Sequence, residues 1–207
     1  MKVYYANVDD NDDLTGMNAI SLVEFPAVDR DFLCFNEQLQ LRKKTEPIIM
    51  RYDAPKKVIT GVVCLADTPL YRHSEDLGDY WVVFTKENIE RMVVKYSKRN
   101  MFNRINLHHD DKRFVDGLVL IESYMVNKGR GICPNEFKDV PNGTWICSFK
   151  VEDDSLWNDI ITSGKLNGFS LQGNFLMDDP FPLNYKKIKT HREKKFDDWV
   201  EEQLKNN

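Results

Sequence analysis

The stretch Thr144-Trp145-Ile146-Cys147-Ser148-Phe149-Lys150-Val151 alternates between apolar and polar side chains. Successive side chains of a β-strand point to opposite faces of its sheet, so one face of this segment is strongly apolar. That face carries Trp145, Cys147, Phe149 and Val151, and the opposite face carries Thr144, Ser148 and Lys150. The pattern predicts a strand that buries one face in a hydrophobic core.

Further segments on both sides of this strand have the same character, with β-branched or aromatic residues bounded by turn-forming residues. They are Val3–Val8, Ala19–Val23, Lys57–Leu65, Tyr80–Phe84, Arg104–His108, Phe114–Val126 and Asn167–Phe175. The part from Leu118 to Ile121 is apolar on both faces, which indicates a central strand.

Three segments have the spacing of amphipathic helices. They are Lys86–Arg99 with Thr85 as N-cap, a helix beginning after Asp153 or Asp154, and Lys194–Leu204 near the C-terminus. Many strands with a few separate helices predict an α+β fold, and we expect a mostly antiparallel β-barrel of about seven or eight strands. We expect this domain to span residues 1–176, with 36–54 as a linker or mobile loop. Residues 177–207 would form a connector and a C-terminal amphipathic helix.

The composition limits the classes of protein that the chain can belong to. It has 207 residues, of which 42% are hydrophobic, and its net charge is −4. This length suits one domain with appendages, and the apolar content excludes a wholly disordered chain. A concentrated basic face and an apolar run of about 20 residues are both missing, so we expect no nucleic-acid partner and no membrane span.

Residues 1–13 contain four aspartates and no apolar core, so we expect no secretion signal. The four cysteines are isolated from one another, as in a reduced protein. Three of them, Cys34, Cys64 and Cys147, have apolar neighbours, which predicts buried structural thiols.

A first candidate site is the segment Gly168-Phe169-Ser170-Leu171-Gln172-Gly173. On a strand, Ser170 and Gln172 share one face, and the glycines let another chain approach closely. The spacing differs from the G-x-S-x-G elbow of the α/β-hydrolases, and no helix follows. Such a serine is most often structural, and its functional interpretation is a nucleophile.

A second candidate is the segment Asn106-Leu107-His108-His109-Asp110. Strand alternation predicts that His109 shares the apolar face of Ile105 and Leu107, where an imidazole can serve as a general base toward a serine. A core histidine bonded to the backbone is the simpler alternative. A metal-dependent hydrolase using His108, His109 and Asp110 is another, but no second ligand pair has suitable spacing, so we expect neither metal nor cofactor.

We expect a carboxylate that orients His109 on the strand that begins at Phe114, after the turn at residues 110–113. If His109 pairs near Phe114, Asp116 is the next residue on the same face, about 7–8 Å away on the diagonal. Asp116 is therefore the first geometric candidate and Asp110 the second. A solvated strand carboxylate is the alternative for Asp116.

These motifs occur in an order that resembles the XkdF-type serine proteases of tailed phages, within the wider group of prohead maturation proteases. The similarity extends from Ile20 to Phe175. The segments that carry it are 20–28 (ISLVEFPAV), 59–61 (ITG), 69–72 (PLYR), 83–89 (VFTKENI), 106–110 (NLHHD), 122–123 (ES) and 164–170 (GKLNGFS).

The resemblance implies an assemblin-like fold in which Ser170 is the nucleophile and His109, followed by an acid, is the base. In related prohead proteases an acid precedes a Ser-Leu-Val segment that follows the nucleophile. In this chain the corresponding segment comes first, as if the fold were circularly permuted, and the matching position is Ala19. The resemblance therefore leaves a Ser–His dyad, or a triad completed by Asp116, Asp110 or His191.

The function implied is a serine endopeptidase that processes scaffold and major capsid protein precursors during phage head maturation. Its place would be the cytoplasm of an infected bacterium, inside assembling proheads. A homodimer is left open. The alternative is a catalytically inactive head-assembly or scaffold-associated protein with the same fold, which the missing acid at Ala19 favours.

Overall fold

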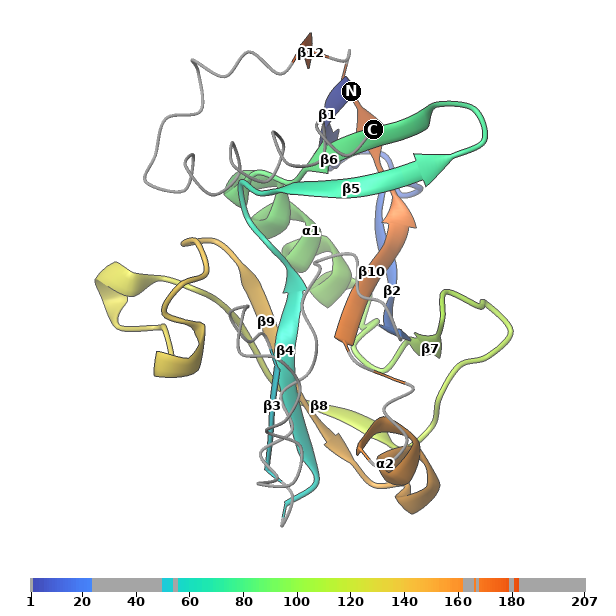
Figure 1. Ribbon diagram of the computed structural model, residues 1–207, viewed down its shortest axis with the longest axis vertical. Coiled ribbons are helices and arrows are strands. Elements are labelled where there is room, and N and C mark those ends of the chain that lie inside the picture. Colours follow the sequence, from blue (N-terminus) through green and yellow to red (C-terminus); the bar gives the residue numbers. More distant parts are fainter. Residues whose placement is uncertain are drawn as a thin grey trace, which may run out of the picture.

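The computed structural model describes residues 2–23, 50–53, 56–161, 166, 168–178 and 181–182 (Figure 1). Its strands are β1 (Lys2–Asn7), β2 (Gly16–Val23), β3 (Met50–Asp53), β4 (Val58–Cys64), β5 (Pro69–Ser74), β6 (Gly78–Val83), β7 (Ile105–Leu107), β8 (Leu118–Met125), β9 (Trp145–Val151), β10 (Gly168–Asn174), β11 (Leu176–Met177) and β12 (Phe181–Pro182). The helices are α1 (Lys86–Lys98) and α2 (Asp154–Ile161), and the short 3₁₀ turns are η2 (Lys128–Arg130) and η3 (Asn135–Phe137).

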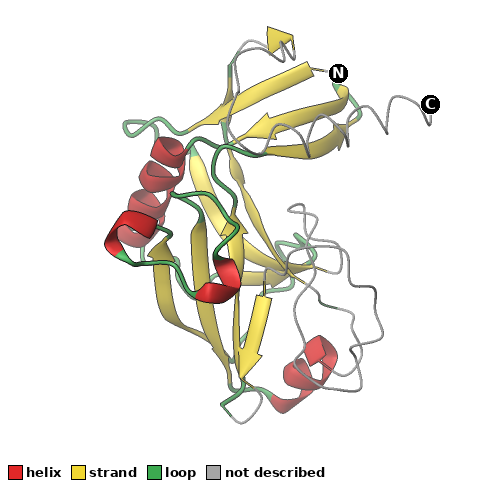
Figure 2. Cartoon of the chain, turned by 60° about the vertical axis from the view of Figure 1, so that its left-hand side comes forward, coloured by secondary structure: helices red, strands yellow, loops and turns green. Residues whose placement is uncertain are grey.

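The described strands form three sheets (Figure 2). One has the order β11-β1-β6-β5, with β12 also pairing with β1. The second has the order β10-β2-β7 and the third β3-β4-β9-β8. Pairing is antiparallel except between β1 and β6 and between β2 and β7. The fold is therefore α+β, as predicted, but none of these sheets closes into a barrel within the described residues.

All eight predicted strands are present, most of them slightly shorter than predicted. The largest shift is in β8, which begins at Leu118 because residues 113–115 pair instead with β7. Four strands were not predicted: β3, β5, β11 and β12. β3 falls inside the segment predicted as a linker or mobile loop, and that prediction is wrong for residues 50–53. The other residues from 36 to 49 lie outside the described part of the chain, and the proposed domain boundary at residue 176 stays a prediction.

The core lies between the β10-β2-β7 sheet and the β4-β9 pair, with α1 against β2. The rings of Phe149 on β9 and Phe169 on β10 lie 5.2 Å apart between their centroids, which joins the two sheets. Tyr96 of α1 contacts Trp145 edge-on at 5.8 Å. The predicted apolar face of the segment 144–151 is buried, because Trp145, Cys147, Phe149 and Val151 are all inaccessible to solvent. The opposite face is also largely buried, since Thr144, Ile146 and Ser148 are 0% exposed, so the prediction of a single buried face is wrong.

Both described helices begin at caps that the sequence predicts. The hydroxyl of Thr85 accepts a hydrogen bond from the backbone N–H of Asn88, and Asp153 Oδ1 accepts one from the N–H of Leu156. The predicted helix 194–204 lies outside the described residues. Within the described part of the chain, no helix is both long enough and apolar enough to cross a membrane.

Replacement of Thr85 by alanine should lower the free energy of unfolding by about 1 kcal/mol, because the first turn of α1 loses its side-chain acceptor. Urea unfolding measures the change. Ser97→Ala is the control, since Ser97 bonds to the carbonyl of Val93 within the same helix and caps nothing. An equal loss in both variants would contradict the capping role.

Candidate functional site

A row of polar side chains crosses the β10-β2-β7 sheet. Ser170 on β10 is the register partner of Ser21 on β2, and Ser21 is in turn the partner of Asn106 on β7. Directly paired residues share one face of a sheet, with Cβ atoms about 4.5–5.5 Å apart in antiparallel pairs. The three side chains are 4%, 0% and 0% exposed, so the row is enclosed by the protein.

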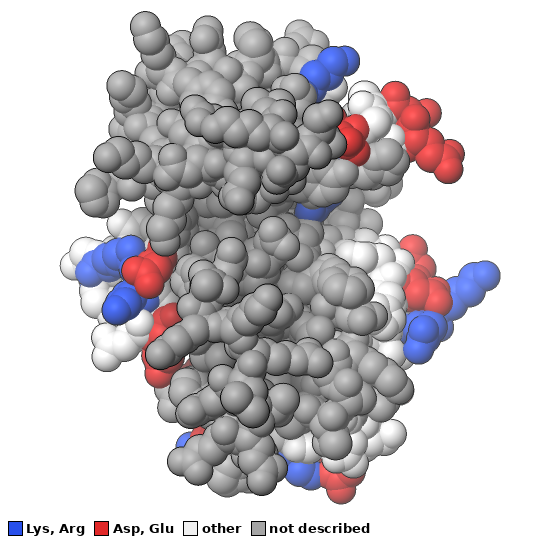
Figure 3. Space-filling model, viewed as in Figure 1, with Lys and Arg blue, Asp and Glu red and all other residues white. Residues whose placement is uncertain are grey.

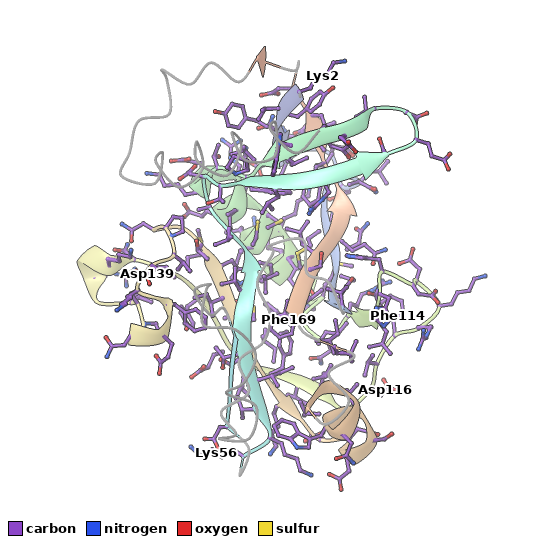
Figure 4. All side chains as sticks on the ribbon, in the orientation of Figure 1. Lys2, Lys56, Phe114, Asp116, Asp139 and Phe169 are labelled. Carbon is purple, nitrogen blue, oxygen red and sulfur yellow. The ribbon has the colours of Figure 1, made fainter. Side chains whose placement is uncertain are left out.

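The alternation of the strands explains how the row forms. The residues that flank Ser170 and Ser21 point to the opposite face and belong to the hydrophobic core: Phe169, Leu171, Ile20 and Leu22. Figure 4 shows Phe169 in the middle of the molecule, on β10 and beside β4. The apolar residues fix the register of the strands, and this register brings the three polar residues together.

His109 joins this row from the turn that follows β7. His108 and His109 both have a left-handed backbone, with φ of 54° and 61°. This conformation is uncommon for residues other than glycine, and strained residues of this kind are concentrated at functional sites. The N–H of His108 donates to the carbonyl of Leu22 at 2.9 Å, which holds the turn against β2. The turn is rich in exposed charge of both signs from Asp111 to Arg113, and Figure 3 shows a mixed group of acidic and basic side chains on that side.

Ser21 is the centre of the resulting hydrogen-bond network. Its Oγ lies 2.6 Å from Asn106 Oδ1 and 2.9 Å from His109 Nδ1. Asn106 Nδ2 donates to Gln172 Oε1 at 2.6 Å, and Gln172 Nε2 donates to Asp111 Oδ1 at 2.9 Å. Five side chains from β2, β7, β10 and the turn after β7 therefore form one continuous chain of hydrogen bonds.

The protein holds the pKa of His109 below its ordinary value. Partial burial of the ring is the largest cause, followed by the positive charges of Arg72 on β5 and of His108. The residue as a whole is exposed, so the imidazole keeps contact with water. Near neutral pH the imidazole is thus uncharged and can accept a proton.

Ser170 lies next to this network without being bonded to His109. Among the described residues no hydrogen bond joins Ser170 Oγ to the imidazole, and Ser21, the cross-strand partner of Ser170, occupies Nδ1. Ser170 is thus one cross-strand position away from the histidine-bonded serine. Hydrogen bonds in catalytic sites are often long or poorly aligned before substrate binds, so this geometry leaves Ser170 a candidate nucleophile.

The three candidates for an orienting third group are placed differently. The register assumed for Asp116 is wrong, because Asn106, and not His109, is the residue that pairs with Phe114. Counted along this register, Asp116 faces Arg104 and is exposed, near α2 in Figure 4. Asp110 uses its Oδ1 to accept the backbone N–H of Lys112 and stabilises the turn.

His191, the remaining candidate, lies outside the described residues. The roles of all three candidates stay predictions. Within the described part of the chain, the side chain that shares a hydrogen bond with the imidazole is Ser21.

The predicted face of His109 also needs correction. Strand alternation placed its ring with Ile105 and Leu107, but β7 ends at Leu107 and the left-handed turn brings the ring to the face of Asn106. Sequence reasoning did not find Ser21, Asn106, Gln172 and Asp111 as members of the network. The available signal was a single serine between Ile20 and Leu22 on a strand, since a polar residue at such a position is enclosed and needs partners.

Two other chemistries receive no support from the described side chains. No group of three or more His, Cys, Asp or Glu residues is placed to hold a metal ion within the described residues. Burial raises the pKa of the Cys64 and Cys147 thiols, as expected for structural cysteines. Cys34, predicted to be buried as well, lies outside the described residues.

No curated protein and no solved structure matches the chain, but a protein family does. Residues 45–177 match the family described as "Putative phage serine protease XkdF", and this range contains both His109 and Ser170, whereas Ser21 precedes it. The chain belongs to this XkdF family.

Proposed function

We propose that the chain is a serine endopeptidase of phage head maturation, in which Ser170 is the nucleophile and His109 the general base. The observation that carries the proposal is the register of β10, β2 and β7. It sets the Ser170 hydroxyl beside Ser21, whose Oγ lies 2.9 Å from the imidazole. The family match supports the class of reaction, and it includes both proposed catalytic residues.

The chemistry follows from these groups. His109 takes the proton of Ser170 as its Oγ attacks a peptide carbonyl, and the tetrahedral intermediate collapses to an acyl-enzyme while the imidazolium protonates the leaving amine. Water, deprotonated by the same imidazole, then releases the acyl group. Backbone N–H groups near the site would stabilise the oxyanion, and each well-placed donor contributes about 3–4 kcal/mol in comparable enzymes.

The position of β10 suggests how a substrate is held. Within the described residues β10 is an edge strand, paired with β2 on one side. An extended peptide could add to the other edge as a further strand, which is a common mode of peptide recognition. The proposed substrates are the scaffold and major capsid protein precursors, processed inside assembling proheads in an infected bacterium. The assemblin-like, circularly permuted arrangement is part of this proposal.

A second candidate function is a head-assembly protein that has lost catalysis. The observation that favours it is the engagement of His109 Nδ1 by Ser21 and not by Ser170. In this case the network would have only a structural role, and Ser170 would be unreactive.

Co-expression with the scaffold and capsid precursors of its own phage tests the proposed function. The wild-type chain should produce shortened precursors, and His109→Gln should not. Glutamine can keep a hydrogen bond to Ser21 but cannot carry the proton. Processing that continues in His109→Gln would contradict the role of the base, and intact precursors with the folded wild-type chain would favour the inactive protein.

The pH dependence of cleavage should report the lowered pKa of His109. Activity requires the neutral imidazole, and a lowered pKa keeps the ring neutral to lower pH. The acid limb of kcat/KM should therefore have its midpoint below the ordinary value of 6.5. Removing the positive charge in Arg72→Met should move this midpoint upward. A midpoint above 6.5 in the wild type would contradict the assignment.

A further inference from the structure

We propose that the chain of hydrogen bonds from Asp111 through Gln172, Asn106 and Ser21 fixes the proton of neutral His109 on Nδ1 and leaves Nε2 as its basic nitrogen. These groups are positioning residues that orient the imidazole from its Nδ1 side. The tautomer follows from the hydrogen bonds alone, and its catalytic use rests on the proposed function.

The chain of hydrogen bonds begins at the carboxylate of Asp111. An ionised carboxylate only accepts hydrogen bonds, so the group of Gln172 that faces Asp111 must be its NH₂. The contact between Gln172 Nε2 and Asp111 Oδ1 is 2.9 Å. The carbonyl oxygen of Gln172 then points the other way, toward β7.

The next link passes over β2 to Asn106. Because Gln172 presents its oxygen, Asn106 must donate a hydrogen bond from its NH₂. The distance between Asn106 Nδ2 and Gln172 Oε1 is 2.6 Å. Asn106 therefore presents its own oxygen to Ser21. Ala19 is the partner of Gln172 on β2, between β10 and β7. Its small side chain leaves room for the glutamine amide to reach across.

The hydroxyl of Ser21 passes the donor-to-acceptor direction of these hydrogen bonds on to the imidazole. Ser21 has one proton, and Asn106 Oδ1 at 2.6 Å is an acceptor that must receive it. The remaining contact of Ser21 Oγ, 2.9 Å from His109 Nδ1, then needs the proton of the ring nitrogen. A neutral imidazole has one N–H, so Nε2 is left with its lone pair.

The opposite tautomer would place two acceptors against each other somewhere along the chain. If Ser21 donated its proton to His109, the lone pairs of Ser21 Oγ would face Asn106 Oδ1. To avoid this, the amide groups of Asn106 and Gln172 would both have to rotate so that oxygen and nitrogen exchange places. The turned Gln172 would then present its oxygen to the carboxylate of Asp111. Asp111 thus sets the direction of every bond, although it lies on the surface and does not contact His109.

Nitrogen-15 NMR of the full chain, labelled at histidine and recorded above the ordinary pKa of histidine, tests the tautomer. The chain has four histidines, and the resonances of His109 are assigned by their loss in His109→Gln. We expect His109 to be protonated mainly on Nδ1. In Ser21→Ala the proton should move mainly to Nε2, the form that free histidine prefers. A wild-type His109 protonated mainly on Nε2, or an unchanged tautomer in Ser21→Ala, would overturn the proposal.

Two surface carboxylates provide a matched pair of variants. Asp111→Asn removes the acceptor that sets the direction of the chain and should raise the Nε2-protonated fraction of His109. Asp110→Asn changes the neighbouring residue, whose side chain caps the turn and is outside the network, and should leave the tautomer unchanged. Equal spectra for the two variants would contradict the role of Asp111. Asp111 is exposed and Asp110 is half-buried in the same turn, so neither change disturbs the core and this comparison remains decisive if Ser21→Ala does not fold.

Kinetics separate this inference from the proposed function. If the chain is a protease, Ser21→Ala should lower kcat about tenfold with little change in KM, because binding groups are retained. Ser148→Ala, an equally buried serine on β9, is the control for folding. The tautomer is measured without turnover, so an inactive chain with Nδ1-protonated His109 would sustain the inference and contradict only the proposed function.

Discussion

Ser170→Ala should abolish peptide cleavage, lowering kcat by about 10⁴-fold or more, as loss of a nucleophile does in serine proteases. Alanine removes the oxygen that forms the acyl-enzyme and changes little else, because the side chain is small and enclosed. The measurement is the rate of cleavage of purified scaffold precursor, followed by gel or mass spectrometry.

The matched control is Ser21→Ala, the same change at the cross-strand partner. Because Ser21 positions His109 without reacting, this variant should retain a measurable rate. If Ser170→Ala cleaves normally and Ser21→Ala is inactive, the serine that contacts the imidazole is the nucleophile and the assignment to Ser170 is wrong.

Gly173→Ala should lower the free energy of unfolding by about 3 kcal/mol. A Cβ atom at this position would lie 2.3 Å from the carbonyl oxygen of Gly16 and 2.8 Å from Met17 Cα. Both are backbone atoms of β2, so no flexible side chain can move aside, and the strands must separate. The register of β10 and β2 already shifts between Gln172 and Gly173. Urea unfolding measures the change.

Gly78→Ala is the control for Gly173→Ala. Gly78 has a φ of +65° and no heavy atom within 4 Å of an added Cβ, so only backbone strain of about 1 kcal/mol is expected. Equal losses in the two variants would show that the close approach of β10 and β2 is not required. Since that approach sets Ser170 beside Ser21, Gly173→Ala should also reduce cleavage.

The strands and helices could largely be predicted from the sequence, because alternation and capping are local properties. The segment 144–151 and the helix after Thr85 are examples, and both are confirmed. Whether the sheets close into a barrel could not be predicted, since this depends on which strands pair. The sequence did not predict β5 because Pro69–Ser74 is short and mixes polar with apolar residues. The polar turn that follows it made the end of the segment resemble a loop.

The candidate site, like the fold, could be predicted only where it depends on local sequence. Ser170 and the segment containing His109 could be found from local sequence, but their partners depend on register between strands far apart in the chain. Ser21 is 85 residues from Asn106 and 88 from His109. The alternation rule failed at His109 because the strand ends in a left-handed turn, which two non-glycine residues rarely form.

The central claim is tested most directly by reaction of the folded chain with a serine-directed phosphonate, followed by peptide mapping. We predict a single adduct on Ser170, which disappears in Ser170→Ala and is much slower to form in His109→Gln. An adduct on Ser21, or no adduct on a chain shown to be folded, would contradict the account.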